Sequence, residues 1–369
     1  MTPRDAISRK LRVCFFIPDF GYGGAQKQCI LLLNELQQRD DVELTLIRFR
    51  PGAQDHLLDT SNLNNVYLGA RSNFDVRAVV KAARVISRSG SDVLISWVRV
   101  CDVYSYFVRL LRPRTKWVMT QRNSRHADSW LFRLRDFLGR RADAIAANSP
   151  GGVQWWEDRR ARGRVYLVDN VAAPPRAVSA LDERNARSVL YVGRMEAQKN
   201  VLTMIQAFVR VAQRQPDVTI WVCGDGAQRA EMEKIVADSG VAERFEFLGF
   251  RTDATEWMSR AKVLVSLSEH EGMPNVLMEG VQADCVIVAS GIREHVDFLG
   301  AEYPHIIQNY YDIDESTAAV VKALSAPSAP DDLAFARRHL ARMAPAAVAA
   351  EYMSIFRDVT TRDQRVSSA

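Results

Sequence analysis

The chain alternates between short apolar runs and longer stretches in which apolar positions recur every three or four residues. Residues 11–18 (LRVCFFIP) form the first run, whose continuous apolar character is typical of a parallel strand buried on both faces. Similar runs predict strands at residues 42–49, 66–68, 92–97, 116–120, 144–147 and 165–168. The stretches between them predict helices at residues 28–36, 75–87, 103–111, 129–138 and 152–159. This alternation indicates a doubly wound parallel sheet.

The same alternation returns in the second half after a break at Ala173-Pro174-Pro175, which marks a linker. Strands are predicted there at residues 188–192, 219–223, 245–248, 263–267 and 286–289. Helices are predicted at residues 201–214 and 228–238, and the chain is helical and alanine-rich after residue 331. Because 369 residues are many for one hydrophobic core, we expect two α/β domains.

Residues 266–281 (SLSEHEGMPNVLMEGV) combine several features of a ligand-binding loop. The segment follows a buried strand, and Pro274 suits the first position of a helix, where its missing N–H costs nothing. Gly272 allows a ligand to approach the backbone closely. We expect the first N–H groups of this helix to bind an anion, most naturally a phosphate. These N–H groups belong to Asn275, Val276 and Leu277.

Two carboxylates, Glu271 and Glu279, bracket this predicted anion site. Because a phosphate repels carboxylates, we expect each of them to face the hydroxyl groups of a sugar or a ribose. The spacing alone supports a simpler interpretation equally well, in which Glu271 is a loop acid and Glu279 a solvated helix residue.

A second candidate phosphate site, GYGGAQ, stands between the first strand and the first helix. In such an arrangement, backbone N–H groups cradle a phosphate. The segment differs from a dinucleotide-binding fingerprint because Gln26 replaces the third glycine. The next strand also ends in Arg48 and Arg50 rather than in an acid. An NADP site would tolerate these arginines, so an NADP-dependent oxidoreductase remains an alternative.

The segment EGMPNVLMEG resembles the E-x7-E segment of retaining family 4 glycosyltransferases, a large group with the GT-B fold. Gly23-Gly24-Ala25-Gln26 after the first strand is similar to another motif of this family. A third similar motif is Val192-Gly193-Arg194 followed by Lys199-Asn200. The three motifs stand in the expected order, and the resemblance covers nearly the whole chain.

The resemblance implies a GT-B architecture, in which two Rossmann-like, doubly wound parallel-sheet domains face each other across a cleft. We expect residues 1–172 to form an acceptor-side, membrane-facing domain and residues 173–345 a donor-binding domain. Residues 346–369 would form a C-terminal helix that returns to the N-terminal domain, because residues 349–359 resemble the last helix of the family.

The resemblance also assigns roles to the matched residues. Arg194 and Lys199 correspond to a pair that neutralises the donor diphosphate, so we expect fixed cations instead of a metal ion, and no cofactor. Two surface cations on a loop are the alternative. Glu271 would contact the donor sugar where oxocarbenium-like charge develops, and Glu279 would bind the ribose hydroxyls. The expected donor-binding residues are Gly23, Gly24, Arg194, Lys199, Phe250, Arg251, Glu271, Gly272, Met273, Pro274, Asn275, Val276, Leu277 and Glu279, among which Arg194, Lys199 and Glu271 would be catalytic.

Some positions match the family pattern less closely. Phe250 and Arg251 stand where family members bind the base, although a core Phe beside a surface Arg is an equal explanation. Many members carry a histidine after the strand predicted at residues 116–120, whereas the nearest histidine here is His126. Arg122, Asn123 and His126 are therefore candidates for contacts with the acceptor or the donor sugar.

Basic residues are concentrated in the first half of the chain. Residues 1–172 contain 28 Lys and Arg against 17 Asp and Glu, and the remainder contains 21 against 27. The basic clusters flank apolar residues such as Trp130 and Trp156, a combination typical of proteins that bind an anionic membrane surface. A solvated basic surface is the alternative, and no recognised motif supports nucleic acid as the partner. The clusters are Arg109/Arg112/Arg114/Lys116, Arg133/Arg135/Arg140/Arg141 and Arg159/Arg160/Arg162/Arg164.

Composition bears on the cellular location. No run of eighteen apolar residues predicts a membrane span, and the first ten residues lack the apolar core of a signal peptide. The five cysteines have no metal-binding spacing and mostly lie in apolar runs, so we expect reduced thiols in the core of a cytosolic protein. Together with the basic clusters, this indicates a cytoplasmic protein that binds the inner face of the membrane peripherally.

We interpret the chain as a retaining, metal-independent glycosyltransferase that uses a nucleotide-diphospho-sugar, with a UDP-sugar favoured. Its acceptor would be a polyprenyl-diphosphate-linked or other surface glycan. A non-catalytic nucleotide-sugar-binding protein and a GT-B-like epimerase remain alternatives. The NADP oxidoreductase ranks last, because it leaves Arg194, Lys199 and the segment 271–279 unexplained.

Overall fold

A computed structural model describes residues 9–70, 72–124, 129–173, 185–327 and 331–366. The chain divides into two compact units. The N-unit comprises residues 1–171 and 343–369, and the C-unit comprises residues 172–342. The prediction from the sequence places these divisions after residues 172 and 345.

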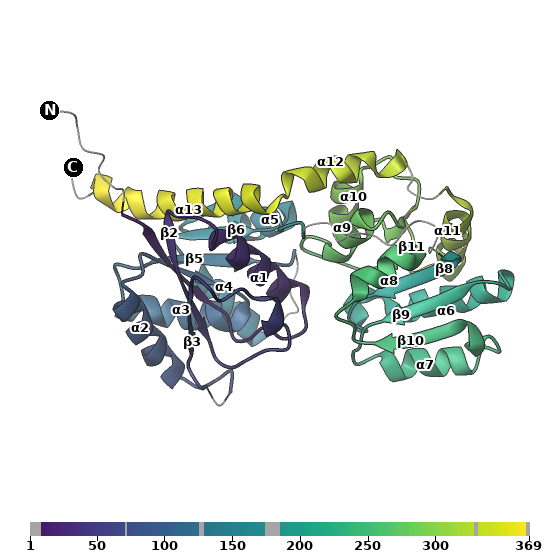
Figure 1. Cartoon of the computed structure of the whole chain (residues 1–369), viewed down its shortest axis with the longest axis horizontal. Helices are drawn as coiled ribbons and strands as arrows, with labels where there is room; N and C mark the ends of the chain where they lie inside the picture. Colours follow the sequence, from purple (N-terminus) through teal and green to yellow (C-terminus); the bar gives the residue numbers. More distant parts are fainter. Residues whose placement is uncertain (1–8, 71, 125–128, 174–184, 328–330, 367–369) are drawn as a thin grey trace. The chain divides into compact units, whose positions relative to one another are not determined.

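Among the described residues, the N-unit contains a seven-stranded parallel sheet in the order β3-β2-β1-β4-β5-β6-β7 (Figure 1). Side chains alternate between its faces: Val13 and Phe15 enter one apolar core, and Cys14 and Phe16 enter the other. Because both faces are buried, the strands are continuously apolar in sequence. The strands are β1 (Leu11–Phe16), β2 (Val42–Arg48), β3 (Leu63–Tyr67), β4 (Val93–Ser96), β5 (Lys116–Gln121), β6 (Ala144–Ala147) and β7 (Arg164–Leu167).

The helices of the N-unit cover both faces of this sheet. Leu32 and Leu33 of α1 share a core with Tyr352 and Phe356 of α13, although α13 is the last helix of the chain (Figure 1). Helices α2 and α3 contribute to the opposite core, and α5 packs beside them through Trp156. The helices are α1 (Gly24–Leu36), η1 (Asp55–Leu57), α2 (Arg77–Ser89), α3 (Arg99–Leu111), α4 (Trp130–Gly139), α5 (Pro150–Asp158) and α13 (Pro345–Val366).

The described part of the C-unit contains a six-stranded parallel sheet in the order β10-β9-β8-β11-β12-β13. Its strands are β8 (Asn185–Val192), β9 (Thr219–Cys223), β10 (Phe245–Gly249), β11 (Ala261–Ser266), β12 (Val286–Ser290) and β13 (Ile306–Ile307). Its helices are η3 (Ala197–Lys199), α6 (Val201–Arg214), α7 (Arg229–Ala237), η4 (Ala242–Arg244), α8 (Ala254–Arg260), α9 (Asn275–Gln282), α10 (Arg293–Leu299), α11 (Ile313–Ser325), η5 (Asp331–Leu333) and α12 (Ala334–Arg342).

The structure confirms the predicted fold of two α/β units built on parallel sheets. Among its described α-helices and strands, the hydrophobic pattern did not predict α8, α10, α11 and β13. Helix α11 had a usable signal, since Asp312 accepts hydrogen bonds from the N–H groups of Asp314 (2.8 Å) and Glu315 (3.1 Å) as an N-cap. The other three elements are short, so their periodicity is weak.

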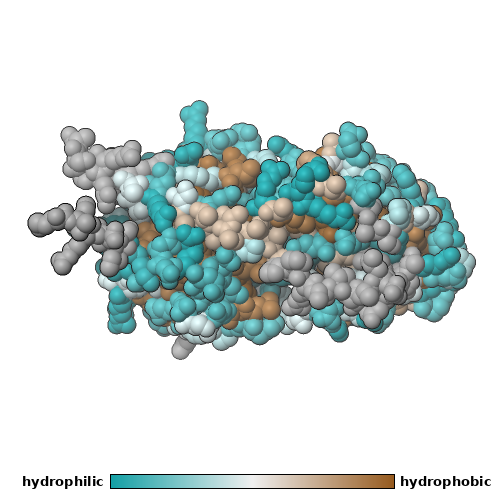
Figure 2. Space-filling model, turned by 45° about the horizontal axis from the view of Figure 1, so that its top comes forward, coloured by the Kyte–Doolittle hydropathy of each residue, from teal (hydrophilic) through white to brown (hydrophobic). Residues whose placement is uncertain are grey.

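Burial follows the sequence pattern closely. All five cysteines are free and buried, as predicted for core thiols. Hydrophilic residues cover most of the face seen in Figure 2, and hydrophobic residues appear between them in smaller groups. Within the described residues, none of the helices combines the length and the apolar character needed to span a membrane.

Candidate functional site

The predicted catalytic residues of the C-unit gather where its sheet changes winding direction. From β8 the chain proceeds through β9 to β10 on one side, and from β11 it proceeds through β12 to β13 on the other. Doubly wound sheets bind their ligands at the carboxyl ends of the strands beside such a switch point. Arg194 and Lys199 follow β8, and Glu271 follows the neighbouring strand β11.

Lys199 and Glu271 form an ion pair at this switch point. The Nζ atom of Lys199 donates to Oε1 of Glu271, which also accepts a hydrogen bond from Oγ of Ser268 (2.7 Å). The two side chains are only 16% and 11% exposed, so solvent screens their attraction weakly. The structure thus brings together two of the three predicted catalytic residues and shows that Glu271 is not a solvated loop acid.

Hydrogen bonds to main-chain carbonyls fix the two loops that carry this pair. The N–H of Glu269 donates to the carbonyl of Gln198 (2.9 Å), and the side-chain amide of Gln198 donates to the carbonyl of His270 (2.9 Å). Asn200, which precedes α6, adopts the left-handed conformation (φ 48°), and its side chain donates to the carbonyl of Tyr310 (2.9 Å). The position of Lys199 relative to Glu271 therefore does not depend on the ion pair alone.

Burial and nearby polar groups shift two pKa values in this region. Burial favours the neutral form of Glu271, but the charge of Lys199, the interaction with His295 and the hydrogen bonds from Lys199 and Ser268 together outweigh it and hold the pKa of Glu271 below its ordinary value. His295, in α10, is completely buried, which lowers its pKa to about 4. At neutral pH the site therefore holds an ionised Glu271 and a neutral His295, a residue that the sequence interpretation missed.

Arg194 stands on a loop that packs tightly against the end of β9. Its side chain is 54% exposed and donates to Glu196 (2.6 Å) and Gln198 (3.3 Å). Gly224 has a φ of 144°, and a Cβ there would lie 1.8 Å from the carbonyl oxygen of Gly193, so a side chain at position 224 would displace the Arg194 loop. The Gly224-Asp225-Gly226 sequence after β9 was the available signal for this support.

The start of α9 differs from the prediction. Pro274 is the N-cap residue, and the helix begins at Asn275. The N–H of Asn275 donates to the carbonyl of Met273 (3.0 Å), and the N–H of Leu277 donates to that of Pro274 (3.0 Å). The prediction that the N–H groups of Asn275, Val276 and Leu277 all point at a ligand is therefore wrong for Asn275 and Leu277, because a tight turn satisfies both.

The remaining donor-side candidates surround this region. Glu279 is partly exposed one turn into α9, while Gly272 is buried and Met273 partly buried between Glu271 and the helix. Phe250 follows β10 and is 42% exposed, and the neighbouring Arg251 donates to Asp253 (2.7 Å). Their predicted contacts with a nucleotide sugar stay predictions.

The N-unit has its own switch point, between β1 and β4, and the glycine loop lies there. Gly23 is the N-cap of α1 and Gly24 is its first residue. The indole N–H of Trp97, which follows β4, donates to the carbonyl of Ala25 (2.7 Å) and anchors the start of the helix. Because the first N–H groups of a helix lack intrahelical acceptors, this geometry fits the predicted anion site.

The predicted acceptor-side residues have different surroundings. Arg122 donates to Asn170 (3.0 Å) and to the hydroxyl of Tyr352 (2.5 Å) in α13, and its guanidinium lies 3.9 Å from the ring centre of Trp97. These contacts favour a structural role, in which Arg122 joins the end of β5 to α13. Asn123 is partly buried and its carbonyl accepts a hydrogen bond from Gln121 (2.6 Å), while His126 lies outside the described residues.

The basic clusters of the N-unit are only partly on the surface. Arg135 is 3% exposed and donates to the buried Asp102 (2.6 Å) and to the carbonyl of Thr120 (3.1 Å). Trp156 is also fully buried. The prediction that these two residues belong to a membrane-facing surface is therefore wrong. Both side chains are buried in the interior of the N-unit, where Arg135 neutralises the buried Asp102.

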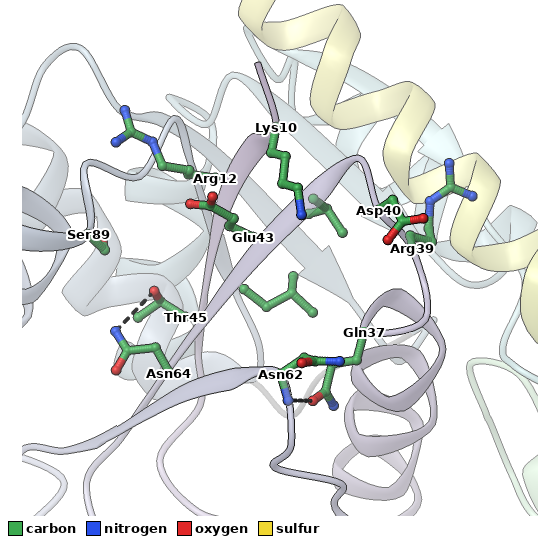
Figure 3. Close-up of a pocket in the computed structure, with 12 residues that line it drawn as sticks. Lys10, Arg12, Gln37, Arg39, Asp40, Glu43, Thr45, Asn62, Asn64 and Ser89 are labelled. Carbon is green, nitrogen blue, oxygen red and sulfur yellow. Dashed lines mark hydrogen bonds between the residues drawn. The ribbon is translucent and has the colours of Figure 1, made fainter. Parts of the chain in front are cut away.

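The N-unit contains a pocket of about 480 Å³ (Figure 3). Lys10, Arg12, Glu43 and Asn62 line it, and they stand at the amino ends of β1, β2 and β3. The glycine loop follows the carboxyl end of β1, so the pocket and the loop occupy opposite edges of the same sheet.

The described residues contain no group of three or more His, Cys, Asp or Glu side chains arranged to hold a metal ion. Asp312-Ile313-Asp314 has the Asp-x-Asp spacing found at some metal sites. However, Asp312 caps α11 through two backbone N–H groups, and Asp314 pairs with Arg210. Both carboxylates thus have structural roles.

Comparison with known proteins finds similar glycosyltransferases. Residues 186–326 match the family described as Glycosyl transferases group 1. The chain is 25% identical over 264 residues to the lipopolysaccharide core biosynthesis glycosyltransferase LpsE of Rhizobium meliloti, covering 70% of this chain and 72% of that protein. It is 24% identical over 317 residues to the N-acetylgalactosamine-N,N'-diacetylbacillosaminyl-diphospho-undecaprenol 4-alpha-N-acetylgalactosaminyltransferase of Campylobacter jejuni, covering 76% and 81%.

Solved structures show the same fold at low identity. Anabaena Alr3699/HepE, solved with UDP and glucose, matches with a TM-score of 0.78 and 16% identity over 94% of this chain and 99% of that one. Sucrose-phosphate synthase of Thermosynechococcus elongatus matches with a TM-score of 0.77 and 16% identity over 96% and 100%. The chain is therefore a glycosyltransferase with the GT-B fold.

Proposed function

We propose that this protein is a retaining, metal-independent glycosyltransferase of family 4 that transfers a sugar from a nucleotide-diphospho-sugar, specifically a UDP-sugar. The observation that carries the proposal is the buried Lys199–Glu271 pair at the switch point of the C-unit, with Arg194 on the adjoining loop. Its acceptor is a polyprenyl-diphosphate-linked or other glycan of the cell surface.

The chemistry of transfer explains why both charges are needed. The leaving UDP carries a diphosphate, whose developing negative charge Lys199 and Arg194 would stabilise without a metal ion. The sugar carbon left behind develops positive charge, and the ionised carboxylate of Glu271 would stabilise it. Glu271 also holds Lys199 in place until the diphosphate arrives, so one ion pair would serve both sides of the bond that breaks.

Properties of similar proteins support the donor and the acceptor class. HepE was solved with UDP and glucose, and the pneumococcal GtfA was solved with UDP and GlcNAc. The Campylobacter jejuni relative is named for a diphospho-undecaprenol acceptor, and LpsE is named for lipopolysaccharide core biosynthesis. We extend these properties to this chain as a UDP-sugar donor and a lipid-linked or glycan acceptor.

The α3–α4 surface supports a peripheral location on the cytoplasmic face of the membrane. We define this surface by its exposed apolar residues Phe107, Leu110, Leu111, Trp130 and Phe137, which are 43–70% exposed. The guanidinium of Arg141 joins the two helices, because it lies 4.5 Å from the ring centre of Phe137 and 5.8 Å from that of Tyr106.

The charges beside this surface are predominantly basic. Arg133 and Arg140 of the predicted cluster are exposed there. The nearby carboxylates are already neutralised, since Asp143 pairs with Arg109 and Asp136 pairs with Arg135 and Arg159. Apolar side chains flanked by arginines suit an anionic lipid surface.

A UDP-release assay tests the proposed function. The wild-type protein should release UDP from a UDP-sugar when a crude lipid-linked glycan acceptor is added, and EDTA should not stop it. Glu271→Gln should lower kcat with little change in donor KM, because the carboxylate acts mainly in the transition state.

The same assay separates the alternatives. Binding of the UDP-sugar without UDP release under any acceptor condition would favour a nucleotide-sugar-binding protein. Conversion of the sugar into its epimer would favour an epimerase, and wild-type turnover of Glu271→Gln would refute the catalytic role of Glu271.

A further inference from the structure

A buried histidine stands behind Glu271, and the mechanism proposed above does not use it. His295 lies in α10 and is 0% exposed, as is Ser290, the last residue of β12. The Nδ1 atom of His295 lies 3.0 Å from the carbonyl oxygen of Ser290 and 3.1 Å from its Oγ. The complete burial of this titratable ring, at the carboxyl ends of the strands, raises the question of what its two contacts with Ser290 do.

The acceptor at Ser290 identifies the tautomer of this ring. A carbonyl oxygen can only accept a hydrogen bond, so Nδ1 of His295 carries the hydrogen, and Nε2 then bears a lone pair. Among the described residues Nε2 has no hydrogen-bond partner, although the atom is buried. The ring is neutral at pH 7, since burial lowers its pKa to about 4. Neutral His295 is therefore a fixed donor toward Ser290.

Ser290 extends the pairing of β12 with β11 beyond the regular sheet. The parallel ladder between these strands ends at the pair Ser266 and Ala289. Past this point, Oγ of Ser290 donates to the carbonyl of Ser268 (2.6 Å) in place of a ladder bond. This side-chain bond keeps the chain after β11 attached to β12 for two more residues.

Ser268 connects this bond to the active carboxylate. Its Oγ donates to Oε1 of Glu271 (2.7 Å), the same oxygen that accepts from Lys199. Hydrogen bonds thus link His295 to Ser290, Ser290 to Ser268 and Ser268 to Glu271, with the carbonyl and the hydroxyl of Ser268 making separate bonds. Ser268 is 0% exposed, so water cannot replace these bonds without opening the core.

We propose that His295 is a positioning residue that holds Glu271 in its reactive orientation through Ser290 and Ser268. The proposal rests on the proposed function of Glu271. It adds to the site a residue of α10, the helix that follows β12. Lys199 and the Ser268 hydroxyl both donate to Oε1 of Glu271, so the two groups together fix this oxygen. Without His295, the carbonyl and the hydroxyl of Ser290 lose the ring that fixes them, and the hydroxyl that donates to the Ser268 carbonyl can reorient.

Three variants of His295 separate positioning from simple packing. Asparagine places an amide N–H near the position of Nδ1, glutamine places it near that of Nε2, and valine removes both. His295→Val and His295→Gln should lower kcat about tenfold with an unchanged affinity for UDP, because a misplaced catalytic group costs turnover and not nucleotide binding. His295→Asn should restore most of the turnover.

A packing role predicts a different order, in which turnover follows side-chain volume and His295→Asn is no better than His295→Gln. That result, or wild-type kcat in His295→Val, would overturn the proposal. His305→Val is the matched control, since His305 is also buried in the C-unit but packs against Tyr303. It should keep the wild-type kcat.

A measurement without turnover keeps this inference separate from the proposed function. In a double-mutant cycle of urea unfolding, the shifts in midpoint caused by His295→Val and Glu271→Gln should not add, because the two residues belong to one network. Additive shifts would overturn the positioning role even if no UDP-sugar is turned over. Absence of UDP release in the wild type with a non-additive cycle would refute only the proposed function.

Discussion

Lys199 and Glu271 are 72 residues apart in the sequence, yet they form a largely buried ion pair at the point where the C-unit sheet changes direction. Each charge reaches the pair from a different strand–loop connection, and two further bonds between the loops hold those connections together. Desolvating two charges is costly, and breaking such a pair by removing one partner is strongly destabilising. The pair is therefore a sensitive point for both ligand binding and stability.

Removal of the lysine should weaken nucleotide binding. If Lys199 contacts the diphosphate, Lys199→Ala should lose a charge-assisted hydrogen bond, about 1.5–3 kcal/mol of UDP binding free energy. Calorimetric titration with UDP measures this loss. Arg187→Ala is the control, because Arg187 pairs with Asp217 at the start of β8, away from the carboxyl edge. Unchanged UDP affinity in both Lys199→Ala and Arg194→Ala would remove the diphosphate assignment.

The two carboxylates of the E-x7-E segment should behave differently. Glu279→Ala should raise donor KM more than it lowers kcat, because a ribose contact is made in the ground state and in the transition state alike. Glu302→Ala, at an exposed position of the same unit, is the control and should leave both parameters unchanged. Steady-state kinetics with a UDP-sugar measure both parameters. A fall in kcat with unchanged KM in Glu279→Ala would instead place this residue at the reacting carbon.

The free energy of unfolding should decrease as the pH is lowered from 6.5 to about 4, because His295 has a lower pKa in the folded protein than in the unfolded chain. Its folded pKa of about 4 lies below the ordinary value of 6.5, so between these pH values the unfolded chain binds a proton that the folded chain does not. The contribution of His295 to the free energy of unfolding is therefore fully present above pH 6.5. It decreases toward pH 4 by about 3 kcal/mol, at about 1.36 kcal/mol per pH unit.

Urea unfolding of the wild type and His295→Asn at several pH values measures this term. The difference between the two proteins should change across this window and level off below it. Glu271, whose folded pKa is also lowered, adds a loss in the same direction only below its ordinary value of 4.5. A constant difference between pH 7 and pH 4 would contradict the assignment to His295.

Two arginines on one helix should differ sharply in their contribution to stability. Arg135→Ala leaves the buried carboxylate of Asp102 without its cation, and we expect a loss of about 3–5 kcal/mol in the free energy of unfolding. Arg133→Ala changes an exposed position of the same helix, and its effect should stay within about 0.5 kcal/mol. Chemical denaturation of both variants measures the contrast, and equal losses would mean that the Asp102 pair is not important for the core.

Membrane binding should depend on the α3–α4 surface and on anionic lipid. In a liposome flotation assay, Arg133→Gln and Arg140→Gln should each weaken binding by about 1 kcal/mol, and added salt should weaken it further. Trp130→Ser and Phe137→Ser should weaken it through lost apolar burial. Arg214→Gln, an exposed substitution in the C-unit, should have no effect. Equal flotation with neutral vesicles would show that apolar contact dominates, and no flotation would make the protein a freely cytosolic transferase.

The sequence by itself determined the fold class and most of the order of elements. Strands buried on both faces must be apolar throughout, and helices on a sheet must be apolar on one side, so both patterns are local and readable. The run at residues 11–18 and the helix at 201–214 are examples. The residues Arg194, Lys199 and Glu271 could be located because they match family motifs that stand beside a predicted strand end or helix start.

Only the tertiary structure decided which polar groups meet. Lys199 and Glu271 pair because β8 and β11 are neighbours in the sheet, and the local pattern does not specify strand order. Arg135 looks like a surface cation in sequence, yet Asp102 on the adjacent helix draws it into the core. His295 reaches Glu271 through Ser290, at the end of β12, and through Ser268, in the loop after the adjacent strand β11. Such contacts join residues far apart in the chain, so hydrophobic periodicity, which extends over one element, carries no information about them.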